Sequence, residues 1–259
     1  MESKYTIKAV MRCLKILDLA ASSDHPLSIN EVCGALALNT NMAFRMLSSL
    51  VTSGFMVKDE STGLYAVSLK ALQLSRNALL SLDIRKLTMP YLELLWNQYP
   101  KANLNMAVYH DGEILVVDRI DSQDIPRTYF TPGKTVPFHC TALGKILTCE
   151  MGNAELETLI SQKGLKSFTE KTITTPAALK KELARVRSDQ LARDREEYIV
   201  KDNCNAVPIR NNEGKIIAAI SLTAFESYMT VEEIEATVPT LRNTARRISD
   251  LAGFHGGMS

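Results

Sequence analysis

The sequence lacks the features of secreted, membrane-spanning and disulfide-stabilised proteins. It has no positively charged start followed by an apolar run, so we expect no signal peptide. No apolar stretch approaches the roughly 20 residues that are needed to cross a bilayer. The five cysteines are odd in number and scattered, which is typical of a reducing compartment. These absences predict a cytoplasmic protein without a membrane partner.

Motifs for cofactors and metals are also missing. The sequence has no phosphate-binding glycine loop, no HExxH motif and no closely spaced Cys/His pair of the zinc-finger type. The formal net charge is only +1, so no global field draws the chain to nucleic acid or to a membrane. We therefore predict no cofactor and no bound metal, and any contact with DNA must come from a local patch.

Length and composition indicate an ordinary globular protein. At roughly 100–200 residues per domain, a chain of 259 residues predicts two domains. Hydrophobic residues make up 46% of the chain and charged residues 23%, a balance that supports a sizeable core.

Acidic residues are absent from a window of 27 residues, between Val32 and Lys58. A helix over 39–55 would gather its apolar residues on one face and its polar residues on the other. The apolar face would carry Ala43, Met46, Leu47 and Leu50, and the polar face Asn41, Arg45, Ser48 and Thr52. A solvated face normally mixes acids with bases, whereas an acid that faces DNA would meet phosphates. The pattern favours a helix for the major groove; the alternative is a gap that arose by chance.

The order of elements around this helix predicts a winged helix-turn-helix. A first helix is expected over 6–21, with an apolar stripe of Ile7, Val10, Leu14, Leu17 and Ala21. A second helix opens at Ser28, where Glu31 completes a capping box. After the third helix, which stops at Gly54, residues 55–67 predict a hairpin around Gly63.

The second part of the chain alternates helices and strands. A leucine-rich helix is expected over 68–81, either as a linker that pairs with its copy or as a plain connector. Beyond it, helices are predicted over 84–99, 141–149, 155–162, 176–193 and from Thr230 to about 251, with strands over 103–110, 113–120 and within 197–224. This pattern predicts a mixed, largely antiparallel sheet with helices on its faces, and an α+β fold overall.

Several ordered motifs resemble the IclR-type bacterial transcriptional regulators over nearly the whole length. They are AVMRCLKILDLAA (9–21), LSINEVCGALAL (27–38), FRMLSSLVTSGFMVKD (44–59), GLYAVSLKALQL (63–74), HCTALGKIL (139–147), TITTPAALKKELARVR (172–187), DREEY (194–198), CNAVPI (204–209) and GKIIAAISLT (214–223). The resemblance implies a winged helix-turn-helix domain (1–67), a linker helix (68–82) and an effector-binding domain similar to GAF and PAS folds (83–259). It also implies homodimers or dimers of dimers on operator DNA, switched by a small organic acid or aromatic metabolite.

By motif position, the resemblance places Thr40, Asn41, Phe44 and Arg45 of the third helix at the DNA. Ser48, on the polar face of the same helix, and Lys58, the one base near the wing tip, complete the predicted set. Asn can pair with adenine and Arg with guanine. The alternatives are a solvated Arg45 and a Phe44 that simply packs. The chain departs from the family at Asn41 and Met42, where Ser or Thr pairs are usual, and in its wing, which is poor in bases. Residues 1–70 hold seven Lys/Arg and six Asp/Glu, so we expect few phosphate contacts and a shallow dependence of affinity on salt.

The resemblance also implies an effector pocket. Thr141 is expected to cap a helix whose first amides, at Ala142 and Leu143, admit a carboxylate. The family lines its pocket at positions that correspond here to Thr128, Asp194, Cys204, Ser221 and Thr223. Ser221 and Thr223 are two apart on a strand and so face the same side. The alternatives are structural: hydroxyls that bond only to backbone, an Asp194 that caps a helix end, and a Cys204 that is a small buried apolar residue.

Two rival functions remain open at this point. One is a Cys-dependent enzyme that uses Cys140, His139 and Asp194, but adjacent residues on an extended segment point to opposite faces. The other is a regulator whose second domain serves only oligomerisation or protein contacts. The prediction is a ligand-responsive, non-enzymatic DNA-binding regulator, in which the effector changes the geometry of a dimer through the 68–81 helix.

Overall fold

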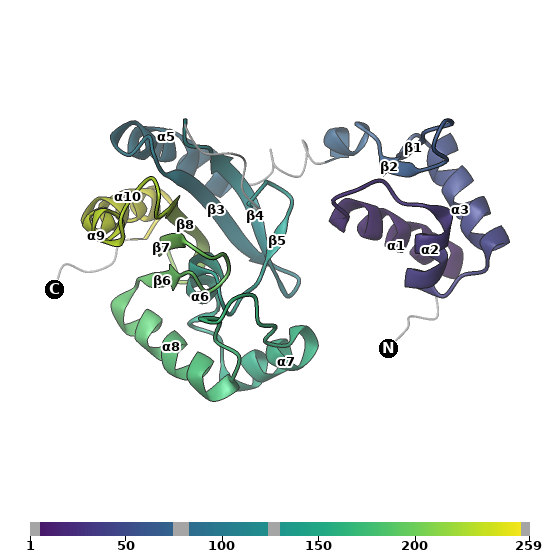
Figure 1. Ribbon diagram of the computed structural model, residues 1–259. Coiled ribbons are helices and arrows are strands. Elements are labelled where there is room, and N and C mark those ends of the chain that lie inside the picture. The colour runs from purple at the N-terminus through teal and green to yellow at the C-terminus, as the bar shows by residue number, and fades with distance from the viewer. Residues whose placement is uncertain (1–5, 75–82, 124–129, 255–259) are drawn as a thin grey trace. The chain divides into compact units, whose positions relative to one another are not determined.

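The computed structural model describes residues 6–74, 83–123 and 130–254 of the chain. The chain divides into two compact units, Met1–Ser81 and Leu82–Ser259 (Figure 1). No helix in these described stretches is both long enough and apolar enough to cross a membrane.

The N-terminal unit has the predicted winged helix-turn-helix order. It contains α1 (Lys8–Ser22), α2 (Ile29–Leu36), α3 (Thr40–Thr52), β1 (Met56–Lys58) and β2 (Tyr65–Val67), with β1 and β2 antiparallel. The predicted capping box of Ser28 and Glu31 opens α2, and the Asn39 side chain caps α3 by accepting from the Met42 amide. Gly54 ends α3 with a φ of 79°, a conformation that only glycine adopts without strain. The wing gains a bridge that sequence reasoning missed, between Leu27 and Tyr65.

The core of this unit confirms the predicted apolar face of α3 but not that of α1. Ala43, Met46, Leu47 and Leu50 are all buried. In α1 the buried residue is Ile16, whereas Ile7, Val10 and Leu14 of the expected stripe are about half or more exposed. The prediction for α1 was wrong because this helix carries apolar residues on more than one face, so periodicity alone does not select the face that packs.

The C-terminal unit is built on a six-stranded antiparallel sheet. Its strands are β3 (Asn103–His110), β4 (Glu113–Ile120), β5 (Thr135–Val136), β6 (Ala192–Arg195), β7 (Asp202–Arg210) and β8 (Ile216–Phe225), in the spatial order β5-β4-β3-β8-β7-β6. The β3–β4 hairpin turns at Asp111 and Gly112, both with positive φ, as a type I′ turn requires.

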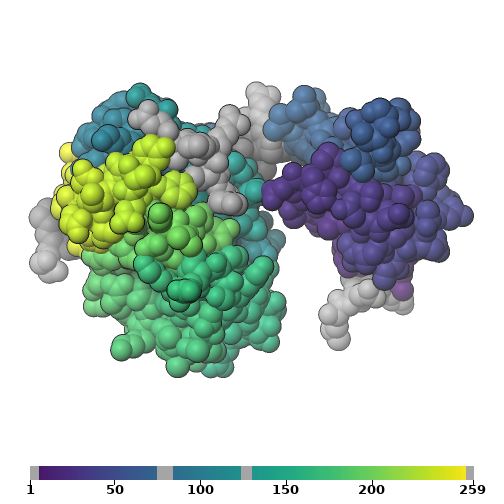
Figure 2. Space-filling view, viewed as in Figure 1, coloured from purple at the N-terminus to yellow at the C-terminus, as the bar shows by residue number. Residues whose placement is uncertain are grey.

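Helices cover both faces of this sheet. They are α5 (Asp83–Gln98), α6 (Ala142–Thr148), α7 (Asn153–Lys163), α8 (Pro176–Asp189), α9 (Val231–Ala236) and α10 (Val238–Leu251). In Figure 1, α5, α9 and α10 lie on one side, and α6 lies on the other, backed by α7 and α8. Figure 2 shows the outer surface of this arrangement, with α10 in yellow beside the green segment that contains α7 and α8. The α+β fold predicted from the sequence is confirmed.

Two predicted helix boundaries were wrong, and one of them changes the place of Asp194. The helix expected over 176–193 stops at Asp189, because Gln190 adopts a left-handed φ of 51° and β6 begins two residues later. Asp194 therefore lies on a strand and does not cap the helix. The last helix is split at Thr237 into α9 and α10. The expected linker helix begins at Ala71 and is described only as far as Leu74; the rest of it lies outside the described residues.

Candidate functional site

The polar face of α3 is open to solvent. Thr40, Asn41 and Arg45 are exposed, Phe44 is 53% exposed, and Ser48 is half-buried. Within the described residues, the Arg45 guanidinium makes no hydrogen bond or ion pair. These side chains are therefore not held by the fold of the unit, and they are available to a partner.

The structure adds two cations that sequence reasoning missed. A groove of about 610 Å³ runs between α1 and α3, and Lys8, Arg12, Asn41 and Arg45 contribute to its walls. Lys8 and Arg12 come from a different helix, so no pattern within α3 reveals them. They raise the positive charge beside Arg45 above what the near-neutral composition of residues 1–70 indicates.

The wing offers little free charge. The Lys58 ammonium is 2.9 Å from the Glu60 carboxylate, which raises the pKa of the lysine. Asp59 accepts from the Ser61 and Thr62 amides and so organises the turn that follows the strand. The only cation predicted at the wing is thus neutralised by a neighbour two residues away.

In the C-terminal unit, strand register gathers polar side chains on one face of the sheet. Asp194, Cys204, Thr223 and Asn103 are successive partners across β6, β7, β8 and β3. Directly paired residues point to the same side of a sheet, so these four form a row. A second row lies two residues along the strands, on the same face of the sheet, and contains Ser221, Asn105 and Arg119. Cys204 belongs to the same core cluster as Ala142 and Leu143, which places both rows on the face that α6 covers.

The start of α6 packs tightly over this face. The Thr141 hydroxyl accepts from the Gly144 amide at 3.1 Å, as predicted for an N-cap. Ala142 and Leu143 are each 1% exposed. A side chain on Gly144 would lie 2.5 Å from the Phe138 Cα, so only glycine lets α6 approach the segment before it this closely. The structure thus brings together six of the seven predicted effector residues, namely Ala142, Leu143, Asp194, Cys204, Ser221 and Thr223; Thr128 lies outside the described residues.

The two hydroxyls on this face of the sheet, those of Ser221 and Thr223, differ in their partners. The Thr223 hydroxyl donates to an Asp202 carboxylate oxygen at 3.0 Å, so it is bonded within the fold, although not only to backbone as the structural alternative expected. Ser221 Oγ instead accepts from the Asn105 amide at 3.2 Å, which leaves its proton for another acceptor. Of the two, Ser221 is better placed to bind a ligand.

Asp194 is held in a deeply buried environment. It is 3% exposed, and its Oδ1 accepts from the Glu197 amide at 2.7 Å. Burial raises the pKa of its carboxyl to about 8, against the opposing effect of that hydrogen bond. Burial likewise raises the pKa of Asp202 to about 6. At neutral pH Asp194 is mostly protonated, and a protonated carboxyl can donate to a ligand oxygen.

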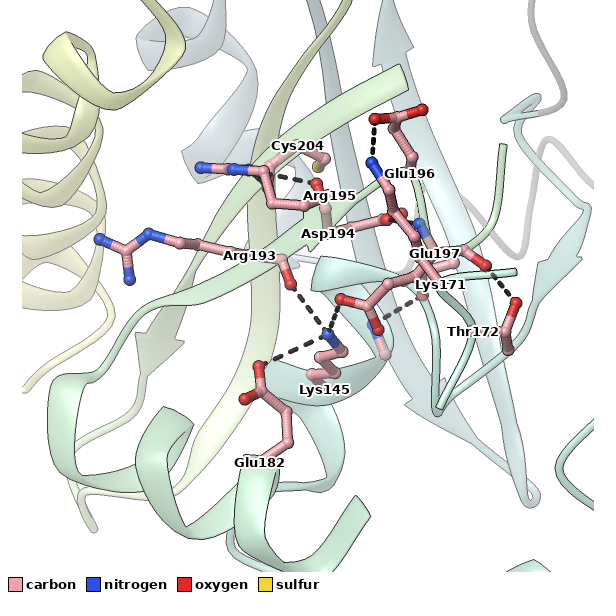
Figure 3. A network of polar contacts seen from close by, with 12 residues as sticks. Lys145, Lys171, Thr172, Glu182, Arg193, Asp194, Arg195, Glu196, Glu197 and Cys204 are labelled. Carbon is pink, nitrogen blue, oxygen red and sulfur yellow. Dashed lines mark hydrogen bonds and ion pairs between the residues drawn. The ribbon is translucent and has the colours of Figure 1, made fainter. Parts of the chain in front are cut away.

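A buried lysine that sequence reasoning missed fixes the segment around Asp194. Lys145 is fully buried, with its ammonium 2.5 Å from Glu197, 3.5 Å from Glu182 and 2.9 Å from the Arg193 carbonyl (Figure 3). These contacts join α6, α8 and the 193–197 segment into one network. Its only signal in the sequence is a charged residue inside an otherwise apolar helix, GKIL.

The thiols of this unit are not activated nucleophiles. Burial raises the pKa of both Cys140 and Cys204 well above the ordinary value, so neither forms a thiolate at neutral pH. His139 Nε2 lies 3.0 Å from the Lys166 carbonyl, and its ring contacts Phe138 and Phe168. Within the described residues, no group of His, Cys, Asp and Glu side chains could hold a metal ion.

Comparison with known proteins gives the family. Residues 76–250 match the family described as Bacterial transcriptional regulator IclR C-terminal, and residues 9–60 match the IclR helix-turn-helix domain. The first match alone covers more than half of the chain. The chain belongs to the IclR family of bacterial transcriptional regulators. IclR-family regulators bind DNA and carry a C-terminal effector-binding domain, and they are not enzymes.

Individual relatives agree along their full lengths. The probable transcriptional regulator SauR of Cupriavidus necator is 27% identical over 243 residues, which are 94% of this chain and 96% of SauR. The crystal structure of an IclR transcriptional regulator from Alicyclobacillus acidocaldarius superposes with a TM-score of 0.81 at 19% identity, over 96% of this chain and 100% of that one. An IclR homolog of Microbacterium hydrocarbonoxydans, complexed with 4-hydroxybenzoate, gives a TM-score of 0.77 at 23% identity, over 94% and 98%. The two structures share the fold of this IclR-family protein.

Proposed function

We propose that this IclR-family regulator senses a small organic acid and changes its affinity for an operator in response, in the cytoplasm and at a catabolic operon. The observation that carries the proposal is the pair of polar rows beneath α6, where Asp194, Cys204 and Ser221 share one buried face. A buried polar face costs free energy unless its groups are paired, and a polar ligand would pair them.

We assign DNA reading to α3. Arg45 and Asn41 would contact base edges, Phe44 a thymine methyl, and Thr40, Ser48 and Lys58 bases or phosphates. With few bases on the unit, affinity would depend on two copies that place their α3 helices in successive major grooves. The ligand would act by binding one geometry of the dimer more tightly than the other.

Two variants test this division of labour. Arg45→Ala should lower specific DNA affinity by about 1–3 kcal/mol per half-site and spare effector binding, because the side chain is exposed and unpaired. Ser221→Ala should do the reverse. The measurements are titration of a labelled operator and thermal shift of the full chain with carboxylic acids. Loss of both activities in each variant would contradict the proposal.

A second candidate function is a C-terminal unit that only contacts protein. The buried position of the polar rows favours the effector function, because a protein partner needs accessible residues. A panel of acids that leaves the melting temperature of the full chain unchanged would favour this second candidate.

A further inference from the structure

The C-terminal unit has a second cavity, away from the effector residues. It measures about 280 Å³ and is lined by the start of β4, by β5 and the segment that follows it, by the loop after α7 and by Tyr198. None of the six effector residues that the structure describes borders it. Ile114 of its wall pairs with Tyr109, which lies four residues along β3 from Asn105, or about 14 Å at roughly 3.4 Å per residue. The cavity is therefore separate from the polar rows beneath α6.

Four rings form a continuous part of the cavity wall. Phe138 and His139 meet edge to face with their ring centroids 5.3 Å apart, and the His139 ring lies 6.1 Å from that of Phe168. Phe168 in turn meets Tyr198 edge to face at 5.0 Å. The other apolar side chains of the wall are those of Ile114, Val136 and Pro137. Such a wall favours a flat ring, because aromatic side chains pack against other rings in offset or edge-to-face arrangements.

The charged groups at this cavity do not require a charged ligand. The Lys163 ammonium pairs with the Glu113 carboxylate, and the Lys166 ammonium lies over the Phe168 ring, 5.4 Å from its centroid. Both lysines are exposed, so water solvates the charge that remains. Neither cation is a buried group that lacks a partner.

His139, by contrast, carries a buried polar atom without a partner. The residue is 3% exposed, and its Nε2 lies 3.0 Å from the Lys166 carbonyl. A carbonyl oxygen only accepts, so the proton of the neutral imidazole is on Nε2, and Nδ1 carries a lone pair. Burial lowers the pKa of this imidazole, which keeps the ring neutral at neutral pH. Nδ1 has no hydrogen-bond partner, and buried acceptors of this kind are normally satisfied by protein, water or a ligand.

We propose that this cavity is a second ligand site, and that it takes a neutral, planar aromatic molecule with one N–H or O–H donor, of the indole or phenol class. The donor would bond to His139 Nδ1, and the ring would pack against Phe168 and Tyr198. Small-molecule sites range from about 300 to 1,000 Å³, so a cavity at the lower end of this range suits one ring or two fused rings.

Aromatic acids fit the same cavity less well. A carboxylate oxygen only accepts hydrogen bonds, as does Nδ1 of the neutral His139, so the two atoms would repel each other. The imidazole is also buried, and a carboxylate beside it would lose its hydration without gaining a buried cation. The ligand class of this cavity therefore differs from the organic acid proposed for the effector pocket.

The first test measures whether the donor matters. Calorimetry of the full chain with indole, 1-methylindole, phenol and anisole compares each donor with a partner whose donor is methylated. We expect indole or phenol to bind about tenfold or more tightly than its methylated partner, because the methyl group removes the hydrogen bond to Nδ1. Indole-3-acetate, which adds a carboxylate, should bind more weakly than indole.

The second test assigns the acceptor to His139. In His139→Gln the side-chain amide nitrogen takes the place of Nε2 and still donates to the Lys166 carbonyl, but nothing replaces Nδ1 as an acceptor. The compound that binds the parent should lose about tenfold in affinity, whereas its methylated partner should bind both proteins within about twofold. An unchanged affinity for the methylated compound would also show that the cavity is intact in the variant.

Two further variants separate the site from general effects of mutation. His25→Gln makes the same change at an exposed histidine of the N-terminal unit, and it should leave the Kd unchanged. Phe168→Leu removes a partly exposed ring of the wall and should weaken both members of a pair, since each packs against it.

Three results would overturn the proposal. One is a methylated compound that binds the parent as tightly as its donor partner. Another is a donor compound that binds His139→Gln within about twofold of the parent. The third is no binding of indole or phenol, which would leave the cavity to water or to a side chain of another protein. None of these results bears on the effector pocket, which the response of Ser221→Ala to carboxylic acids tests separately.

Discussion

The two candidate sites differ in the exposure and in the hydrogen bonding of their polar side chains. On α3 the polar residues face solvent, and Arg45 has no partner among the described residues. On the sheet of the C-terminal unit, Asp194, Ser221 and Thr223 are at most 3% exposed, and each has hydrogen bonds within the protein. The side chains of the first site therefore contribute little to the stability of their unit, whereas those of the second site belong to its core.

This difference predicts how mutations act. A change on α3 removes contacts only in the complex with DNA, so it should leave the free energy of unfolding within about 0.5 kcal/mol of the parent. A change in the pocket also alters the core, because buried polar groups that lose a partner are costly. Function and stability are therefore separable in one unit and linked in the other.

The largest expected effect is that of Lys145→Met in the C-terminal unit. Glu197 and Glu182 are only 13% and 16% exposed in their side chains, and both would lose their buried ammonium. Removal of one member of a buried ion pair costs about 3–5 kcal/mol. Urea unfolding of the full chain should show this loss in the transition of the C-terminal unit.

The N-terminal unit provides the matched comparison for that experiment. Arg45→Ala, also a loss of one cation, should leave both unfolding transitions unchanged. Lys145→Met combined with Glu197→Gln should recover part of the stability, because the uncompensated buried charge is removed. Equal stability of Lys145→Met and the parent would show that the network in Figure 3 does not stabilise the unit.

A smaller effect, with a defined pH dependence, is expected for Asp194→Asn. The pKa of this carboxyl is about 8 in the folded protein and near its ordinary value of 3.8 in the unfolded chain. Between these values the unfolded state has lost the proton that the folded state keeps, so stability falls as pH rises from about 4 to 8. At about 1.4 kcal/mol per pKa unit, and after relaxation, the loss is on the order of 2–4 kcal/mol.

The variant should remove most of that dependence. Asn cannot ionise, so the Asp194→Asn protein should have a flatter stability profile over this range and should approach or exceed the parent at pH 8. Urea midpoints measured at half-unit steps from pH 4.5 to 8.5 check this. Parallel profiles for the two proteins would mean that Asp194 ionises normally in the fold.

The two sites also differ in how much of each could be predicted from the sequence, because one is exposed and the other is buried. An exposed site depends on local composition, so the acid-free window, the apolar face of α3 and the cap at Ser28 could be predicted from the sequence. The cap at Asn39 was not predicted and comes from the structure. The α1 face could not, since burial depends on a partner surface that the helix sequence does not contain. In the C-terminal unit, the resemblance supplied Asp194, Cys204, Ser221 and Thr223, but only strand register shows that Asp194 and Cys204 lie on the same face as the two hydroxyls.

The residues that sequence reasoning missed are those whose roles depend on distant partners. Lys145 meets Glu182 and Glu197, which are 37 and 52 residues away in sequence. Arg119 donates to Asn105, on the neighbouring strand. Apart from the apolar residues that flank Lys145 in α6, no local pattern distinguishes either of them from an ordinary surface charge.

The smallest expected effect on DNA binding is that of Lys58 in the wing. Unlike Arg45, this cation of the exposed site has a partner within the protein. Lys58 already pairs with Glu60, so Lys58→Ala should change the slope of log affinity against log salt by less than one per monomer. Glu60→Gln frees the ammonium and should raise DNA affinity at low salt. Fluorescence anisotropy of a labelled operator from 50 to 300 mM KCl, on the order of the range over which such slopes are measured, provides both values. A change of two or more for Lys58→Ala would mean that the lysine leaves Glu60 for phosphate, and that the wing contributes more to binding than its charge balance indicates.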